Sequence, residues 1–137
     1  VFKDNLYTKE EMKMIDETKK IMSDDRMRIT ATTVRVPVYR SHAESVNVEF
    51  EDKVTLEAAR AAIAAFPGII LRDNPAEQEY PMPLFTSNKY DVEIGRLRYD
   101  ESQENTLNFW ICGDQIRKGA ALNALQIAEY MIAHDLV

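Results

Sequence analysis

The sequence predicts an α+β fold, in which a mixed, largely antiparallel sheet carries helices packed on one face. Helical and strand patterns alternate along the chain, and apolar alternations flank two polar stretches, one around His42 and one around Asn105. Hairpin-like pairs of this kind favour antiparallel neighbours over the crossovers of an all-parallel sheet. The 137 residues, 45% of them hydrophobic, suit a single domain with a real core.

The first predicted element is a helix from about Lys9 to Met22. Thr8 and Glu11 have the spacing of a capping box, and no proline or glycine interrupts the residues that follow. Glu10 and Lys13 fall one turn apart on the polar side, where a solvated face with ion pairs is the simplest interpretation.

A strand is predicted from near Arg28 to Val38, because Val34, Val36 and Val38 alternate with polar residues and should enter a core. Arg35 would then point to the opposite face. Pro37 suggests an edge position or the strand's end, and a loop carrying His42 should lead to a returning strand from Val46 to Phe50.

The remaining elements follow from similar signals. Thr55 should cap a helix that Pro67 and Gly68 stop, and the last helix should run from about Lys118 to His134. Between them we expect a short strand, Ile69–Leu71, and irregular chain, Asp73–Pro83. A hairpin should follow, with strands at Val92–Tyr99 and Thr106–Ile111.

Composition limits the classes of partner and compartment. A formal net charge of -6 without a dense basic run argues against nucleic acid or an anionic membrane as the main partner. Cys112 is the single cysteine, which excludes an intrachain disulfide and favours a reducing cytoplasm. We find no pattern of a signal peptide or membrane span.

The four glycines are too scattered for a phosphate-binding or dinucleotide fingerprint. Together with the missing initiator methionine, this suggests a piece of a longer protein whose nucleotide domain lies elsewhere. A processed or engineered start would explain the missing methionine equally well.

Several side chains are candidates for chemistry, each with a plain structural alternative. His42 suits proton exchange near neutral pH, although a lone loop histidine is more often incidental. Arg35 can grip a carboxylate bidentately or serve in a structural ion pair. His134 fits a role at a helix end, Cys112 fits a core filler, and no ligand spacing predicts a metal site.

Four blocks of sequence, in order, resemble aspartate-semialdehyde dehydrogenases over nearly the whole chain. They run from Tyr7 to Met14, from Thr30 to Val46, from Val92 to Arg98, and from Arg117 to Glu129. The part resembled is the carboxy-terminal portion, which has the fold of a glyceraldehyde-3-phosphate-dehydrogenase-like C-terminal domain. The resemblance implies a substrate-binding and dimerisation domain over 1–116 and a closing helix over 117–137 that packs on the nucleotide domain.

The resemblance also implies an activity. The family interconverts L-aspartyl 4-phosphate and L-aspartate 4-semialdehyde with NADPH or NADP and phosphate, on the route to lysine, threonine and methionine. It implies that Arg35 grips the substrate carboxylate, Glu10 the amino group and Lys13 the phosphate, with His42 as general acid/base. Further residues resemble the segment near the nicotinamide: Lys118, Gly119 and Asn123.

Some positions depart from the family pattern. Thr33 stands where cysteine is common, Gln115 where asparagine is common, and Cys112 where a small aliphatic residue is usual, so Cys112 should not be the nucleophile. In the family the nucleophilic cysteine and the NADP loop belong to the amino-terminal half. We therefore expect this chain alone to be inactive.

The resemblance further implies a homodimer or dimer-based tetramer acting on a small-molecule substrate and phosphate in the cytoplasm. Two alternatives stay open. The chain could be a non-catalytic dimerisation module derived from the family, although four retained candidate residues speak against that. A sister enzyme acting on N-acetyl-glutamyl phosphate fits the block from Arg35 to His42 poorly.

Overall fold

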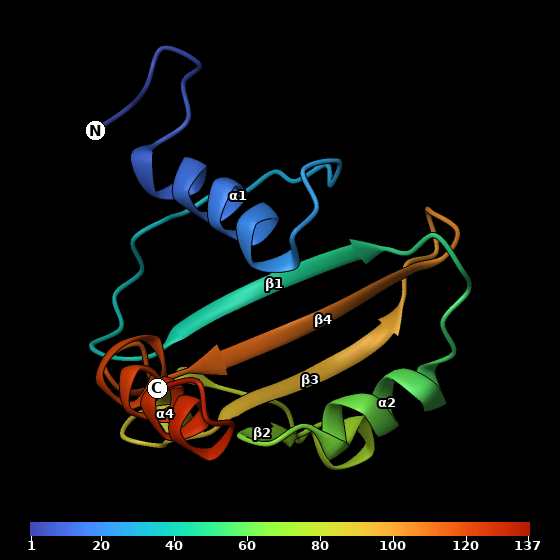
Figure 1. The fold of residues 1–137 in the computed structure, drawn as a ribbon. Coiled ribbons are helices and arrows are strands. Elements are labelled where there is room, and N and C mark those ends of the chain that lie inside the picture. Colours follow the sequence, from blue (N-terminus) through green and yellow to red (C-terminus); the bar gives the residue numbers. More distant parts are fainter. The chain divides into compact units, whose positions relative to one another are not determined.

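The computed structural model describes all residues, 1–137, and divides into two compact units, Val1–Pro37 and Val38–Val137. Figure 1 shows a single helix in the first unit and a sheet with its own helices in the second. The sequence-based expectation was one domain. The boundary proposed at 116/117 stays a prediction, and the second unit includes the last helix.

The first unit is built on α1, Lys9–Met22, with the predicted bounds. Its capping box is formed: the Thr8 hydroxyl accepts from the Glu11 N–H at 3.1 Å, and the Glu11 carboxylate accepts from the Thr8 N–H at 2.7 Å. Two otherwise unsatisfied N–H groups are thereby paired. The helix ends at Ser23, which adopts a left-handed conformation with φ 53°.

The strand predicted from Arg28 to Val38 is wrong. The backbone there belongs to no strand, and Val34, Val36 and Val38 are 75%, 55% and 47% exposed instead of buried. Alternation predicts a strand only where a neighbouring strand supplies the ladder, and no such ladder forms over this segment. Arg35 therefore lies on extended, irregular chain.

The second unit contains a mixed sheet in the order β1-β4-β3-β2 (Figure 1). β1 (His42–Glu49) and β3 (Val92–Tyr99) each pair antiparallel with β4 (Thr106–Gly113), and β2 (Ile69–Leu71) pairs parallel with β3. The mixed, largely antiparallel sheet of the predicted α+β fold is confirmed, as are the short strand and the hairpin around Asn105.

The hairpin predicted around His42 is wrong, and so is the loop assigned to this residue. His42 begins β1, four residues before the expected start of the returning strand, and its ladder partner is Gly113 of β4. A long-range antiparallel pairing therefore replaces the local one. This pairing fixes His42 at the edge strand's first position.

Helices and turns connect the strands. α2 (Leu56–Ala65) has the predicted cap at Thr55 and contacts β2 and β3. The irregular segment contains a 3₁₀ turn, Pro75–Glu77, and is followed by a short helix that was not predicted, α3 (Pro83–Thr86). The single helix predicted from Lys118 instead begins as a π-helical turn, η2 (Arg117–Ala121), and continues as α4 (Leu122–Ala133).

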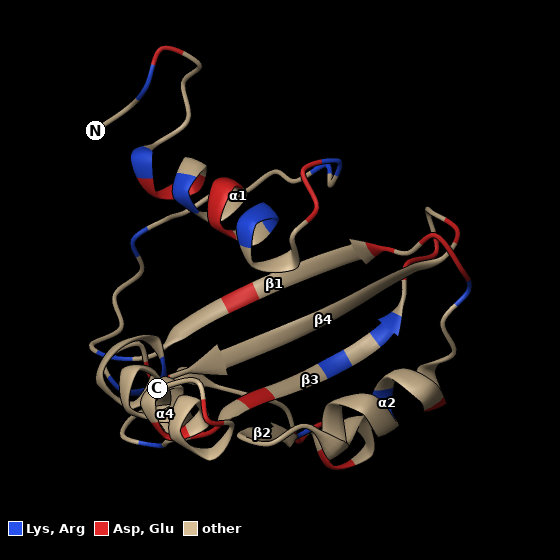
Figure 2. Cartoon of the chain, viewed as in Figure 1, with Lys and Arg blue, Asp and Glu red and all other residues tan.

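The core of the second unit lies on β3 and β4, where Ile94, Leu97, Leu107 and Cys112 are buried. β3 also carries basic side chains in its second half (Figure 2), including Arg96 and Arg98. None of the helices is both long enough and apolar enough to cross a membrane.

Candidate functional site

Glu10 and Lys13 lie together on the exposed side of α1. The Lys13 Nζ and a Glu10 carboxylate oxygen are 3.8 Å apart, and both side chains are more than half exposed. An exposed pair of this kind contributes little to stability. Both charged groups are therefore available to a ligand, as the substrate-binding prediction requires.

Glu11 connects α1 to the segment that carries Arg35. Besides its capping contact, its carboxylate accepts a hydrogen bond from the Thr33 N–H at 2.8 Å. The N–H groups of Thr8 and Thr33 lower the pKa of Glu11, so the buried group stays ionised. The chain two residues before Arg35 is thus tied to the helix of Glu10 and Lys13, while the Arg35 side chain is exposed.

His42 is exposed at the first position of β1, and its imidazole makes no hydrogen bond within the chain. Its cross-strand partner Gly113 has no side chain to cover the ring. β4 ends at Gly113, and the chain passes from there into η2. His42 and the residues predicted to lie near the nicotinamide therefore share one end of the sheet.

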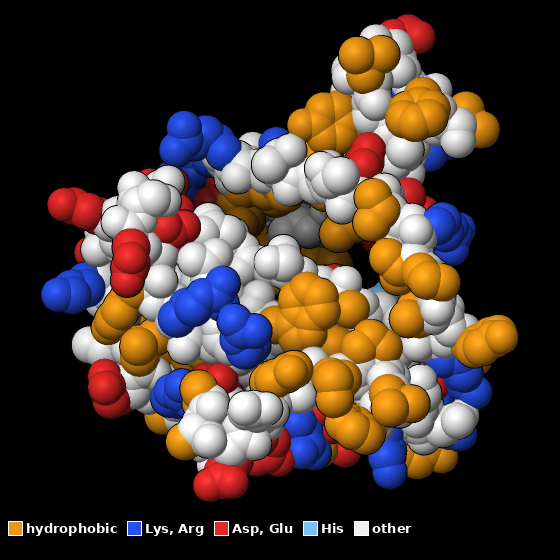
Figure 3. All heavy atoms as spheres, turned by 180° about the vertical axis from the view of Figure 1, so that it is seen from behind, with side chains coloured by type: hydrophobic (Ala, Val, Ile, Leu, Met, Phe, Trp, Pro, Cys, Tyr) orange, Lys and Arg blue, Asp and Glu red, His pale blue; other side chains and the backbone are white.

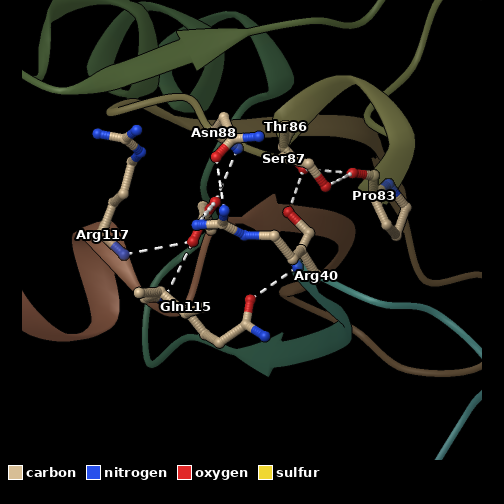
Figure 4. A network of polar contacts seen from close by, with 10 residues as sticks. Arg40, Pro83, Thr86, Ser87, Asn88, Gln115 and Arg117 are labelled. Atoms are coloured by element: carbon tan, nitrogen blue, oxygen red, sulfur yellow. Dashed lines mark hydrogen bonds and ion pairs between the residues drawn. The ribbon is translucent and has the colours of Figure 1, made fainter.

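A polar network with a buried centre holds the two residues that precede His42 (Figure 4). Arg40 donates to the Asn88 side chain at 2.6 Å and pairs with Asp114 at 2.9 Å. Ser41 has a left-handed backbone, φ 77°, and its hydroxyl lies 2.5 Å from that of Thr86. The Ser41 N–H donates to the Gln115 side-chain oxygen at 2.7 Å.

Asp114 is the centre of this network. Burial by itself would raise its pKa, but the N–H groups of Asn88, Ile116 and Arg117 and the Arg40 guanidinium lower it below its ordinary value. The carboxylate is therefore charged although its side chain is fully buried. Gln115, one of the positions that depart from the family pattern, accepts the hydrogen bond that anchors Ser41.

The three residues predicted to contact the cofactor lie on η2 and α4. Lys118 donates to the Gln126 side chain at 2.6 Å, and Asn123 is exposed with its amide unpaired. A Cβ at Gly119 would meet only the Gln115 Cβ, at 3.7 Å, so the glycine leaves open space. A cation, a free amide and an open backbone surface fit a nicotinamide dinucleotide chemically.

The other candidates have structural explanations. Cys112 is completely buried, and burial raises its pKa to about 11, so its thiol is protonated near neutral pH. His134 stacks on Tyr130 and bonds the Tyr130 carbonyl through Nδ1 at 2.8 Å, at the end of α4. No three His, Cys, Asp or Glu residues gather where they could hold a metal.

The network around Asp114 was not predicted from the sequence; its members are Arg40, Ser41, Thr86, Asn88 and Asp114 itself. One signal was available: an aspartate directly after an apolar strand and before helical residues is a capping pattern. Asp114 does accept from the Ile116 and Arg117 N–H groups at 2.9 and 3.2 Å. Its long-range partners had no comparable signal.

Comparison with known proteins identifies the family. The family model described as "Semialdehyde dehydrogenase, dimerisation domain" matches residues 1–118. The chain belongs to this semialdehyde dehydrogenase family. It is 52% identical over 128 residues to the aspartate-semialdehyde dehydrogenase of Synechocystis and 45% identical over 137 residues to that of Aquifex aeolicus. These alignments cover 93% and 100% of this chain.

Solved semialdehyde dehydrogenase structures have the same fold. The Vibrio cholerae aspartate semialdehyde dehydrogenase II, described as complexed with ASA, matches with a TM-score of 0.91 and 40% identity over 97% of this chain. A probable aspartate-semialdehyde dehydrogenase from Pseudomonas aeruginosa matches with a TM-score of 0.87 and 26% identity. The chain spans only about two fifths of these relatives, 38% of the Synechocystis protein and 40% of the Aquifex protein.

Proposed function

We propose that this chain is the substrate-binding and dimerisation part of an NADP-dependent aspartate-semialdehyde dehydrogenase. The observation that carries the proposal is the match over residues 1–118 to a semialdehyde dehydrogenase family model. Relatives at 52% and 45% identity bear the name aspartate-semialdehyde dehydrogenase. The reaction would interconvert L-aspartyl 4-phosphate and L-aspartate 4-semialdehyde, a step of lysine, threonine and methionine biosynthesis.

Three residues of the first unit would hold the substrates. The exposed Arg35 guanidinium would bind the substrate carboxylate through two parallel N–H bonds. Glu10 would accept from the substrate amino group, and Lys13 would attract phosphate as a point charge. The exposure and mutual proximity of Glu10 and Lys13 support this division, because neither charge is consumed by the fold.

His42 would handle the proton. In the direction of aldehyde oxidation, a thiol outside this chain adds to the aldehyde, and the resulting hydroxyl must lose its proton as hydride departs. An imidazole without an internal hydrogen bond can accept that proton, and in the reverse direction it can return it. The alternative nucleophile inside the chain, Cys112, is protonated and buried.

NADP would supply the hydride acceptor for this oxidation. NADP would be oriented by a cation from Lys118, an open surface at Gly119 and a free amide from Asn123. Most of the binding would come from outside this chain, which has no glycine-rich loop. We propose that the 137 residues alone do not catalyse the reaction.

The second candidate function is a non-catalytic dimerisation module of the same family, favoured by the dimerisation description of the matched model. Replacing His42 by alanine in the full-length protein separates the two. If His42 is the acid/base residue, its loss should lower kcat by about a hundredfold or more. His134→Ala removes the other histidine of these 137 residues and should leave kcat unchanged. Equal rates for wild type and His42→Ala would contradict the catalytic proposal.

The assembly would be a homodimer or a dimer-based tetramer in the cytoplasm. The dimerisation domain supports an oligomer. The buried, unpaired thiol of Cys112 supports a reducing compartment.

A further inference from the structure

Asp114 joins three chain segments that are distant in sequence. One carboxylate oxygen accepts from the Ile116 and Arg117 N–H groups at the start of η2. The other accepts from the Asn88 N–H at 2.7 Å and pairs with the Arg40 guanidinium at 2.9 Å (Figure 4). All four donors converge on a side chain with no exposure to water.

Two of the anchored segments border His42. Arg40 comes two residues before it, and Gly113, its ladder partner on β4, directly precedes Asp114. The intervening residue, Ser41, is buried and bonded to Gln115 and Thr86. The imidazole itself has no hydrogen bond within the chain, so its position depends on this backbone.

An amide cannot replace the Asp114 carboxylate. Both oxygens accept, one from two backbone N–H groups and the other from a backbone N–H and a guanidinium. In asparagine one oxygen becomes an NH₂ group, which would face donors in either orientation. At least one pair of contacts must therefore open, and one of the two pairs includes Arg40, two residues before His42.

We propose that Asp114 is a positioning residue for His42, holding the imidazole in place through Arg40, which lies just before β1, and through Gly113 at the end of β4. The inference rests on the proposed function, because it assigns Asp114 a role in catalysis through His42. A displacement on the order of 1 Å at a reacting group can cost up to about a hundredfold in rate without a change in substrate affinity.

Asp73 provides a matched control in the same unit. Its side chain is similarly buried, pairs with Arg60 and accepts from the N–H groups of Arg96 and Leu97 at 2.7 and 3.3 Å. It anchors β3 and lies outside the passage into β1. Asp73→Asn and Asp114→Asn thus remove the same kind of contact, and only one of them borders His42.

The experiment measures kcat, KM for the semialdehyde, and the thermal unfolding midpoint of the full-length protein for both variants and for His42→Ala. We expect Asp114→Asn to lower kcat about 10- to 100-fold with KM within about threefold. Asp73→Asn should lower the unfolding midpoint similarly and keep kcat within about threefold of wild type. Arg40→Gln, which spares the backbone contacts of Asp114, should reduce kcat by an intermediate factor.

Three results would overturn the inference: an unchanged kcat in Asp114→Asn, an equal loss in Asp73→Asn, or a loss confined to KM. If Asp114→Asn does not fold, Arg40→Gln decides by the same criteria. A kcat of His42→Ala equal to that of wild type would contradict the proposed function itself. A reduced kcat in His42→Ala together with an unchanged kcat in Asp114→Asn would contradict only the role of Asp114.

Discussion

At the scale of single residues, the buried charge of Asp114 makes stability depend on pH. Its pKa in the folded chain lies below its ordinary value of about 3.9. Such a group contributes its full stabilisation above the unfolded pKa and loses it as pH falls through the folded pKa. The carboxylate should therefore favour folding at neutral pH and cease to do so in acid.

We expect the urea midpoint of the chain to fall when the pH is lowered from about 6 to about 3. Asp114→Asn should have a lower midpoint at neutral pH and a shallower decline, because the ionisable group is gone. Other carboxylates with lowered pKa values, such as Glu11, contribute equally to the pH dependence of both proteins, so their effect cancels in the comparison. Parallel pH profiles of the two proteins would contradict this assignment.

At the scale of elements, Glu11 connects a helix to the chain segment that follows it. Its carboxylate accepts from the Thr8 N–H inside the cap and from the Thr33 N–H outside it. One side chain thus caps the start of a helix and orders irregular chain, although neither the helix nor the segment contributes a buried apolar residue.

Glu11→Ala should leave both N–H groups without their acceptor and so weaken the contacts that they anchor. Amide hydrogen exchange at Thr33 should become faster in this variant. Glu17→Ala removes an exposed glutamate from the same helix and should not change exchange at Thr33. Unchanged Thr33 exchange in Glu11→Ala would show that another contact holds the segment.

β3 depends on the absence of a side chain at Gly95. A Cβ built there would lie 2.0 Å from the Arg72 carbonyl oxygen and 2.6 Å from the Pro81 ring. Gly95→Ala should therefore force β3 away from that segment and destabilise the fold by about 3 kcal/mol or more. Gly119→Ala, where the nearest atom is 3.7 Å away, should change the urea midpoint little.

At the scale of the whole molecule, exposed apolar side chains outnumber those in the core. The buried apolar residues are Pro81, Ile94, Leu97, Leu107 and Cys112, whereas Leu84, Phe85 and Tyr90 are among many large apolar residues that are exposed. Figure 3 shows apolar side chains gathered beside basic ones on one face. Contiguous exposed apolar patches are typical of surfaces that contact a partner.

A dimerisation domain with such surfaces should associate. We expect light scattering at micromolar concentration to give at least twice the 15.8 kDa of the single chain. Added salt should weaken the association only slightly, because apolar contacts are not screened. A monomer at all salt concentrations would contradict self-association through this chain.

The sequence by itself determined the local elements and the family. The capping box, the α2 cap and the hairpin around Asn105 depend on short-range hydrogen bonds and turn residues, and the structure has them as predicted. The four resembling blocks also indicated semialdehyde dehydrogenase, which the family match bears out.

Only the tertiary structure decided which strand His42 joins and what holds it. Residues 28–38 and β1 both alternate in polarity, but alternation does not specify a ladder partner. β1 pairs with β4, which is distant along the chain: Asn47, for example, lies opposite Asn108, 61 residues later. The network of Asp114 likewise depends on burial and on contacts between distant segments. Those are properties of the packed chain, so no local pattern could reveal them.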